Sequence, residues 1–74
     1  PNPAVDFLNI RSNMNLKNSA ISIIDLSGKE KRRERIRDNM STKEIDISDL
    51  KAGIYYVKII DSAGSESTRK IYVK

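Results

Sequence analysis

The chain has 74 residues, and 14 Lys or Arg against 10 Asp or Glu give it a net charge of +4 at pH 7. A chain of this length forms one small domain with too little interior for a deep catalytic cleft, and it contains neither Cys nor His. Disulfides, Cys/His zinc sites, thiol nucleophiles and imidazole bases are therefore excluded, and we expect neither an enzyme nor a cofactor. The modest positive charge favours acidic partners.

The first third of the chain predicts two strands. Residues 5–11 and 20–26 are short, rich in β-branched or apolar residues and bounded by turn-forming residues. The apolar alternation of the second segment changes phase at Ile24, which predicts a bulge or a strand buried on both faces. Leu16 lies in the connection as a plug for the core, and Ser27-Gly28-Lys29 turns the chain.

The segment from Lys29 to Asp38 has nine charged residues in ten. Local propensity favours a helix, but Ile36 alone cannot supply the apolar stripe that a helix needs for packing. A charged edge strand or a mobile loop is at least as consistent with this composition. We predict that residues 29–37 are peripheral and mobile, with fast amide exchange.

The second half predicts three more strands. Residues 43–48 alternate cleanly, a turn follows at residues 49–53, and strands over residues 54–61 and 68–74 form a hairpin with its tip at residues 62–65. The predicted fold is all-β, a small immunoglobulin-like antiparallel β-sandwich of six or seven short strands in one domain, residues 1–74. Its predicted core comprises Leu8, Ile10, Ile21, Ile23, Ile45, Ile47, Tyr55, Val57, Ile59, Ile71 and Val73.

The segment Leu50-Lys51-Ala52-Gly53-Ile54-Tyr55 is the most informative motif in the chain. Its residues have a structural explanation, in which Gly53 takes a positive backbone dihedral in the turn and Leu50 plugs the end of the sandwich. The Tyr55 ring fills the core with its hydroxyl at the rim. Together with the opening Pro1-Asn2-Pro3 and the closing Lys70 to Lys74, the motif resembles the C-terminal sorting domains of the type IX secretion system of Bacteroidota.

This resemblance implies a secretion signal that directs fused upstream cargo across the outer membrane. Its implied partners are the outer-membrane components of that system and a sortase-like peptidase that removes the domain. The protein would be exported, passing through the periplasm to the cell surface or the medium. The sorting-motif residues by resemblance are Pro1, Asn2, Pro3, Leu50, Gly53, Tyr55, Lys70 and Lys74. One departure stands out, because Lys31 occupies a position at which the family pattern has an apolar residue.

A candidate docking face follows from the period-two geometry of the last two strands. It comprises Tyr56, Lys58, Lys70, Tyr72 and Lys74, which all project away from the predicted core. The alternative is a solvated face whose lysines protect an edge strand. A nucleic-acid partner is not expected, because two tyrosines make a thin stacking platform. A small-molecule substrate is not expected either.

Two further motifs could indicate a cation or catalytic site and a glycosylation site, but each has a simpler explanation as a turn. Asp46 and Asp49 are spaced like an acid/base pair or a cation site, but Asp is also what turns are made of, so we expect no metal there. Asp61-Ser62-Ala63 resembles an O-glycosylation pattern of Bacteroidota, and a bare turn is the better interpretation. For the whole chain, the alternative to a sorting domain is a generic immunoglobulin-like accessory or adhesion module of an extracellular protein.

Overall fold

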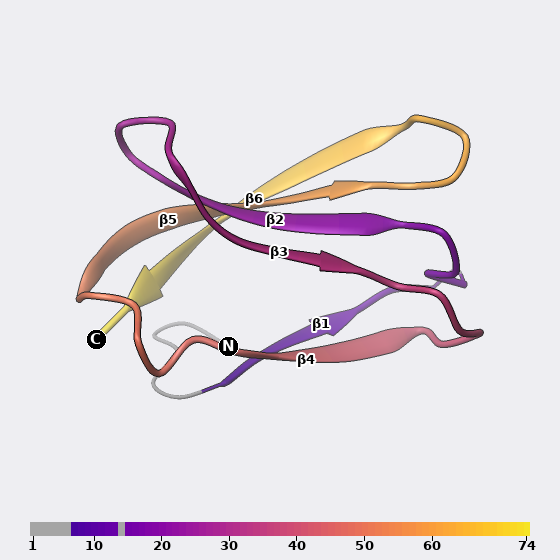
Figure 1. Ribbon diagram of the computed structural model, residues 1–74, viewed down its shortest axis with the longest axis horizontal. Coiled ribbons are helices and arrows are strands. Elements are labelled where there is room, and N and C mark those ends of the chain that lie inside the picture. Colours follow the sequence, from indigo (N-terminus) through magenta and orange to yellow (C-terminus); the bar gives the residue numbers. More distant parts are fainter. Residues whose placement is uncertain (1–6, 14) are drawn as a thin grey trace.

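The protein is described by a computed structural model that places residues 7–13 and 15–74. In these residues the chain forms six strands and no helix (Figure 1). A two-stranded sheet in the order β1-β4 faces a four-stranded sheet in the order β3-β2-β5-β6, and neighbouring strands in both sheets are antiparallel. The all-β sandwich is therefore confirmed. The strands are β1 (Phe7–Arg11), β2 (Ala20–Asp25), β3 (Glu30–Arg35), β4 (Thr42–Asp46), β5 (Gly53–Ile60) and β6 (Glu66–Val73).

The core lies between the two sheets and matches the alternation read from the sequence. Every predicted core residue is buried except Ile59, which is half-buried and packs against the core. Ile59 lies opposite Ser67 of β6, so a small polar residue stands where an apolar neighbour would have covered it. Leu16 is buried as the predicted plug, and Ile36 joins the core as a member that the sequence analysis did not include.

The charged segment forms the edge strand β3, which pairs with β2. Backbone partners on β2 therefore override the local preference for a helix, and the loop alternative is wrong. The edge position of β3 agrees with the predicted peripheral location, but Ile36, which lies within the predicted range, is buried in the core. Mobility and fast amide exchange stay predictions. The register shifts between Ile23 and Ile24, which lie opposite Arg32 and Glu30. Lys31, the departure from the family pattern, is thus the bulged residue that has no residue opposite it on β2.

Side chains on the inner side of β3 close one side of the sandwich. Arg32 and Glu34 lie opposite the fully buried Ile23 and Ile21, so they face the second sheet. The Arg32 guanidinium pairs with Asp49, and the Lys43 Nζ of β4 lies 3.6 Å from the Glu34 carboxylate. At these inward-facing positions β3 therefore forms ion pairs, whereas the other strands form apolar contacts at theirs.

The β2–β3 and β5–β6 hairpins share one five-residue turn. In the first, the Asp25 carboxylate accepts the amides of Ser27 at 2.9 Å and Lys29 at 3.0 Å. In the second, Asp61 accepts the corresponding amides of Ala63 and Ser65 at 2.9 Å. The glycine at the fourth position has φ of 90° in one turn and 88° in the other, a conformation that other residues rarely adopt. The sequence Asp-x-x-Gly-x therefore encodes both turns.

Candidate functional site

The segment from Leu50 to Tyr55 shapes one end of the sandwich. Leu50 is half-buried against the core, and its amide donates to the Ile47 carbonyl at 3.0 Å. Gly53 has φ of 154°, and a Cβ there would meet no atom within 4 Å, so conformation rather than space favours glycine. The buried Tyr55 donates its hydroxyl to the Lys51 carbonyl at 2.7 Å. Leu50 and Tyr55 thus have the expected structural positions, whereas Gly53 begins β5 instead of lying in the turn. The sorting role of these residues stays a prediction.

The predicted docking residues of β5 and β6 lie on the side of the four-stranded sheet that faces away from the core. Tyr56 lies opposite Lys70 and is 37% exposed, and Tyr72 is 45% exposed. The Lys70 Nζ lies 5.9 Å from the centre of the Tyr72 ring, a cation–π arrangement. Lys74 follows β6 and is exposed. We call this side of the four-stranded sheet the outer face.

Lys58 forms an ion pair on the outer face. Its Nζ lies 3.1 Å from the Glu66 carboxylate, on the strand beside it. Part of its charge is therefore neutralised within the protein, and it is half-buried rather than fully exposed. Lys70, Tyr72 and Tyr56 thus make up the more accessible part of the outer face.

The outer face continues onto β2 and β3, which the sequence analysis did not include. Ile24 lies opposite Tyr56, and Ser22 lies between Lys58 on one neighbouring strand and Arg33 on the other. Ile54, opposite Tyr72, is half-buried. An apolar and aromatic strip edged by cations results, a composition typical of protein interfaces. The successive isoleucines Ile23 and Ile24 were the signal, because neighbouring residues of a strand point to opposite faces of the sheet and so place an apolar side chain on each face.

Asp46 and Asp49 have different partners in the structure. The Asp46 carboxylate accepts the Ser48 hydroxyl at 2.7 Å and the Ser48 amide at 2.9 Å, while Asp49 pairs with Arg32. The Ser48 hydroxyl, followed by its amide, lowers the pKa of Asp46 below the ordinary aspartate value. Hydrogen bonds from the Ser27 hydroxyl and the Lys29 amide lower the pKa of Asp25 in the same way. These carboxylates stabilise turns.

Residues 7–13 and 15–74 contain no group of three His, Cys, Asp or Glu side chains that could hold a metal ion. The same part of the chain has no helix long and apolar enough to cross a membrane. Pro1, Asn2 and Pro3 of the expected motif lie outside the described residues.

Comparison with known families tests the resemblance. The family described as the secretion system C-terminal sorting domain matches residues 1–74, which is the whole chain. No curated protein and no solved structure matches. The family is a sorting signal rather than a class of enzymes, and it implies an exported protein with cargo fused upstream and the secretion machinery as partner. The chain therefore belongs to the family of C-terminal sorting domains and is a secretion signal for the type IX secretion system.

Proposed function

We propose that the outer face is the surface by which the type IX machinery reads this domain. In this proposal an outer-membrane component binds the face while the cargo is in the periplasm, and the cargo then crosses the outer membrane. A sortase-like peptidase afterwards removes the domain. The observation that carries the proposal is the exposure of Tyr56 and Tyr72 beside Lys70, outside the core.

The sorting-motif residues divide into two groups by position. Leu50, Gly53 and Tyr55 shape the β4–β5 connection, so they act on recognition through the fold. Lys70 and Lys74 are exposed and so can contact a partner directly. Exposed aromatic rings flanked by cations suit a partner surface that offers apolar groups and carboxylates.

The test is delivery of a reporter fused upstream of residue 1 in a bacterium with a working type IX system. Lys70→Ala combined with Lys74→Ala should leave the fold intact, since both side chains are exposed, and the reporter should accumulate in the periplasm. A matched control, Lys17→Ala with Lys29→Ala, removes the same charge from exposed positions elsewhere and should export normally. Both variants must unfold at the same urea concentration as wild type.

Equal surface delivery by the Lys70/Lys74 variant would remove these residues from the signal. Removal by a peptidase has its own readout, which is a tag placed after residue 74. Surface cargo should lack this tag, while periplasmic cargo retains it. Surface cargo that keeps the tag would contradict the cleavage step, but it would not contradict recognition through the outer face.

A further inference from the structure

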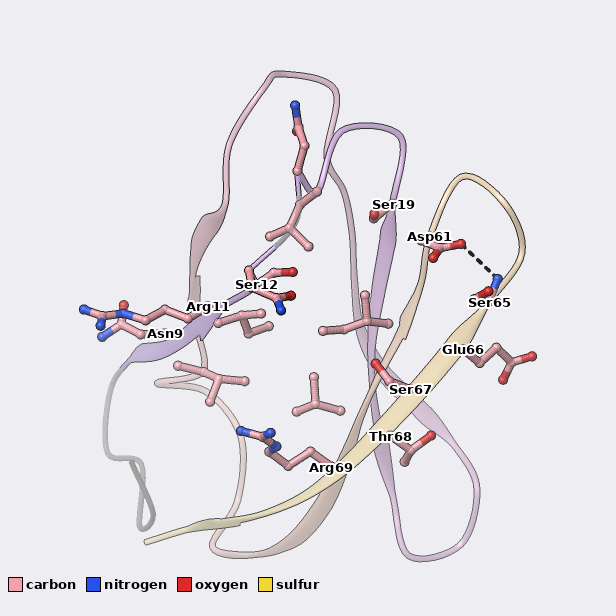
Figure 2. Close-up of a pocket in the computed structure, with 17 residues that line it drawn as sticks. Asn9, Arg11, Ser12, Ser19, Asp61, Ser65, Glu66, Ser67, Thr68 and Arg69 are labelled. Carbon is pink, nitrogen blue, oxygen red and sulfur yellow. Dashed lines mark hydrogen bonds between the residues drawn. The ribbon is translucent and has the colours of Figure 1, made fainter.

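The β1–β6 side of the sandwich is open, in contrast to the side that carries the ion pairs. Within the described residues, β1 pairs with β4 alone and β6 pairs with β5 alone, so each strand has a free edge. A cleft of about 750 Å³ lies along this side (Figure 2). Its apolar lining comes from the core residues Leu8, Ile10, Leu16 and Val57 and from the half-buried Ile59.

β6 changes character halfway along its length. Its final inward residues, Ile71 and Val73, are buried, whereas Ser67 and Arg69, on the same side of the strand, are exposed. Ser67 lies opposite Ile59 and Arg69 lies opposite Val57. Figure 2 shows Arg69 extending from β6 toward the side on which β1 lies, while Thr68 and Glu66 point the other way. The first half of β6 therefore lines the cleft with polar groups above an apolar floor.

Two polar side chains at this cleft lack partners within the described residues. Arg69 takes part in none of the ion pairs formed by residues 7–13 and 15–74. Ser19 also lines the cleft, is 1% exposed, and its hydroxyl has no hydrogen-bond partner. A buried hydroxyl without a partner is costly, so it marks a place where an added group would be stabilised.

We propose that this cleft binds an extended acidic peptide segment of another protein, which adds as a strand to the free edge of β6. Strand addition would satisfy the unpaired backbone groups of that edge. Alternate side chains of the peptide would then reach the apolar floor, and an Asp or Glu would pair with Arg69. The Ser19 hydroxyl would gain a partner from the bound segment.

Charge favours a foreign acidic segment over a second copy of this chain. Two copies would each bring a net charge of +4 and an Arg69 to the shared edge, and like charges across a strand pair are destabilising. An acidic strand would instead be attracted to Arg69, because the two charges are opposite. This surface is separate from the outer face, so the inference does not rest on the proposed recognition by the export machinery.

The experiment uses the isotope-labelled 74-residue chain and capped synthetic heptapeptides of alternating valine and threonine, with a central aspartate or a central lysine. The aspartate peptide should shift the NMR signals of residues 8–12 and 65–69 and spare those of Tyr56 and Tyr72. It should bind on the order of tenfold more tightly than the lysine peptide, because a charge-assisted hydrogen bond to Arg69 is lost in the latter.

Two N-methylated forms of the aspartate peptide test the backbone. Methylating the alternate amides that face β6 should abolish binding, whereas methylating the other alternate set should leave binding within about twofold, since only one set of amides pairs in a strand ladder. Equal tolerance of the two forms would overturn strand addition.

Three variants test the named residues. Arg69→Glu should make the domain bind the lysine peptide more tightly than the aspartate peptide. Arg33→Glu makes the same change on the outer face and is the control, so this variant should still prefer the aspartate peptide. Ser19→Ala should weaken binding about threefold and yet leave the free domain at least as stable, because it removes a buried hydroxyl without a partner. The proposal is overturned if neither peptide binds, if the shifts map to the outer face, if the domain self-associates through β6, or if residues 1–6 give contacts with the cleft.

Discussion

The β3–β4 side of the sandwich is closed by ion pairs, whereas the β1–β6 side is open as a cleft. On the β3–β4 side, Arg32 and Glu34 reach across to Asp49 and Lys43, and Ile36 completes the inner row of the edge strand. On the β1–β6 side, Ser67 and Arg69 occupy the corresponding inner row and no ion pair spans the gap among the described residues. Figures 1 and 2 show these two sides in turn.

Inward-facing charge therefore has different structural roles on the two edge strands β3 and β6. On β3 the charges have partners on β4 or in the connection that follows it, so they join the layers while protecting an edge strand from aggregation. On β6 the inward cation has none among the described residues, and the same kind of residue keeps a cleft open. The partner, rather than the residue type, separates a structural charge from a binding one.

The largest expected effect comes from breaking the core on which both sides rest. Val57→Asp would bury an unpaired carboxylate at a position that is 4% exposed, so we expect a loss of at least about 3 kcal/mol, enough to unfold a domain of this size. Tyr56→Asp, one residue away on the outer face, is the matched control and should remain folded. Circular dichroism on heating checks both, and unchanged unfolding of Val57→Asp would overturn the observed register.

The next prediction compares the loss of unfolding free energy when an isoleucine is truncated on the closed β3–β4 side and on the open β1–β6 side. Ile36→Ala should cost about 2 to 4 kcal/mol, because the side chain is 2% exposed and leaves a cavity. Ile59→Ala at the open cleft should cost about 1 kcal/mol, because this side chain is only half-buried and solvent can fill the space. Urea unfolding measures both, and equal losses would mean that the two sides are packed alike.

A smaller effect concerns the ion pairs between the sheets. A double-mutant cycle of Glu34→Ala and Lys43→Ala should give a coupling of roughly 0.2 to 1 kcal/mol, since both groups are partly exposed. The coupling should fall in about 1 M salt, where screening is strong. The control is the pair of Arg33 and Glu30, which lie 4.0 Å apart within β3 and are more exposed, and which should couple less. A larger coupling in the control would contradict the closing role of the β3–β4 pairs.

The smallest effect is a dependence on pH at the turns beside the closed side. The pKa values of Asp25 and Asp46 are lowered by the hydroxyls of Ser27 and Ser48. A lowered folded-state pKa stabilises the fold above the unfolded value of about 3.9, and this stability is lost as pH falls through the folded-state pKa. Ser27→Ala should therefore weaken the decline of the urea midpoint between pH 6 and pH 2.5. A decline identical to that of wild type would exclude this carboxylate from the acid response.

Much of the fold could be predicted because a strand with one buried face shows alternating apolar residues in its sequence, and this alternation indicates which side chains point inward. Alternation placed Tyr55 and Val57 inside, and it placed Tyr56 and Tyr72 outside, so the exposed positions of these two tyrosines could be predicted without a structure. Their role in docking stays a prediction. The extension of the outer face to Ile24 and Arg33 was missed, because lateral strand order brings β2 between β5 and β3 and no local pattern encodes that order.

Local sequence alone determined the turns and the family of this protein. Asp-x-x-Gly-x sets each hairpin through bonds within five residues, and the motif from Leu50 to Tyr55 acts within one connection. Tertiary structure decided the state of the charged segment, the burial of Ile36 and the opening beside Arg69. In each case the deciding partner is distant in sequence: Ile36 pairs with Ser19, Arg32 pairs with Asp49, and the cleft lies between β1 and β6. Long-range contacts of this kind leave no periodic trace in a single sequence, because they depend on which strands become neighbours.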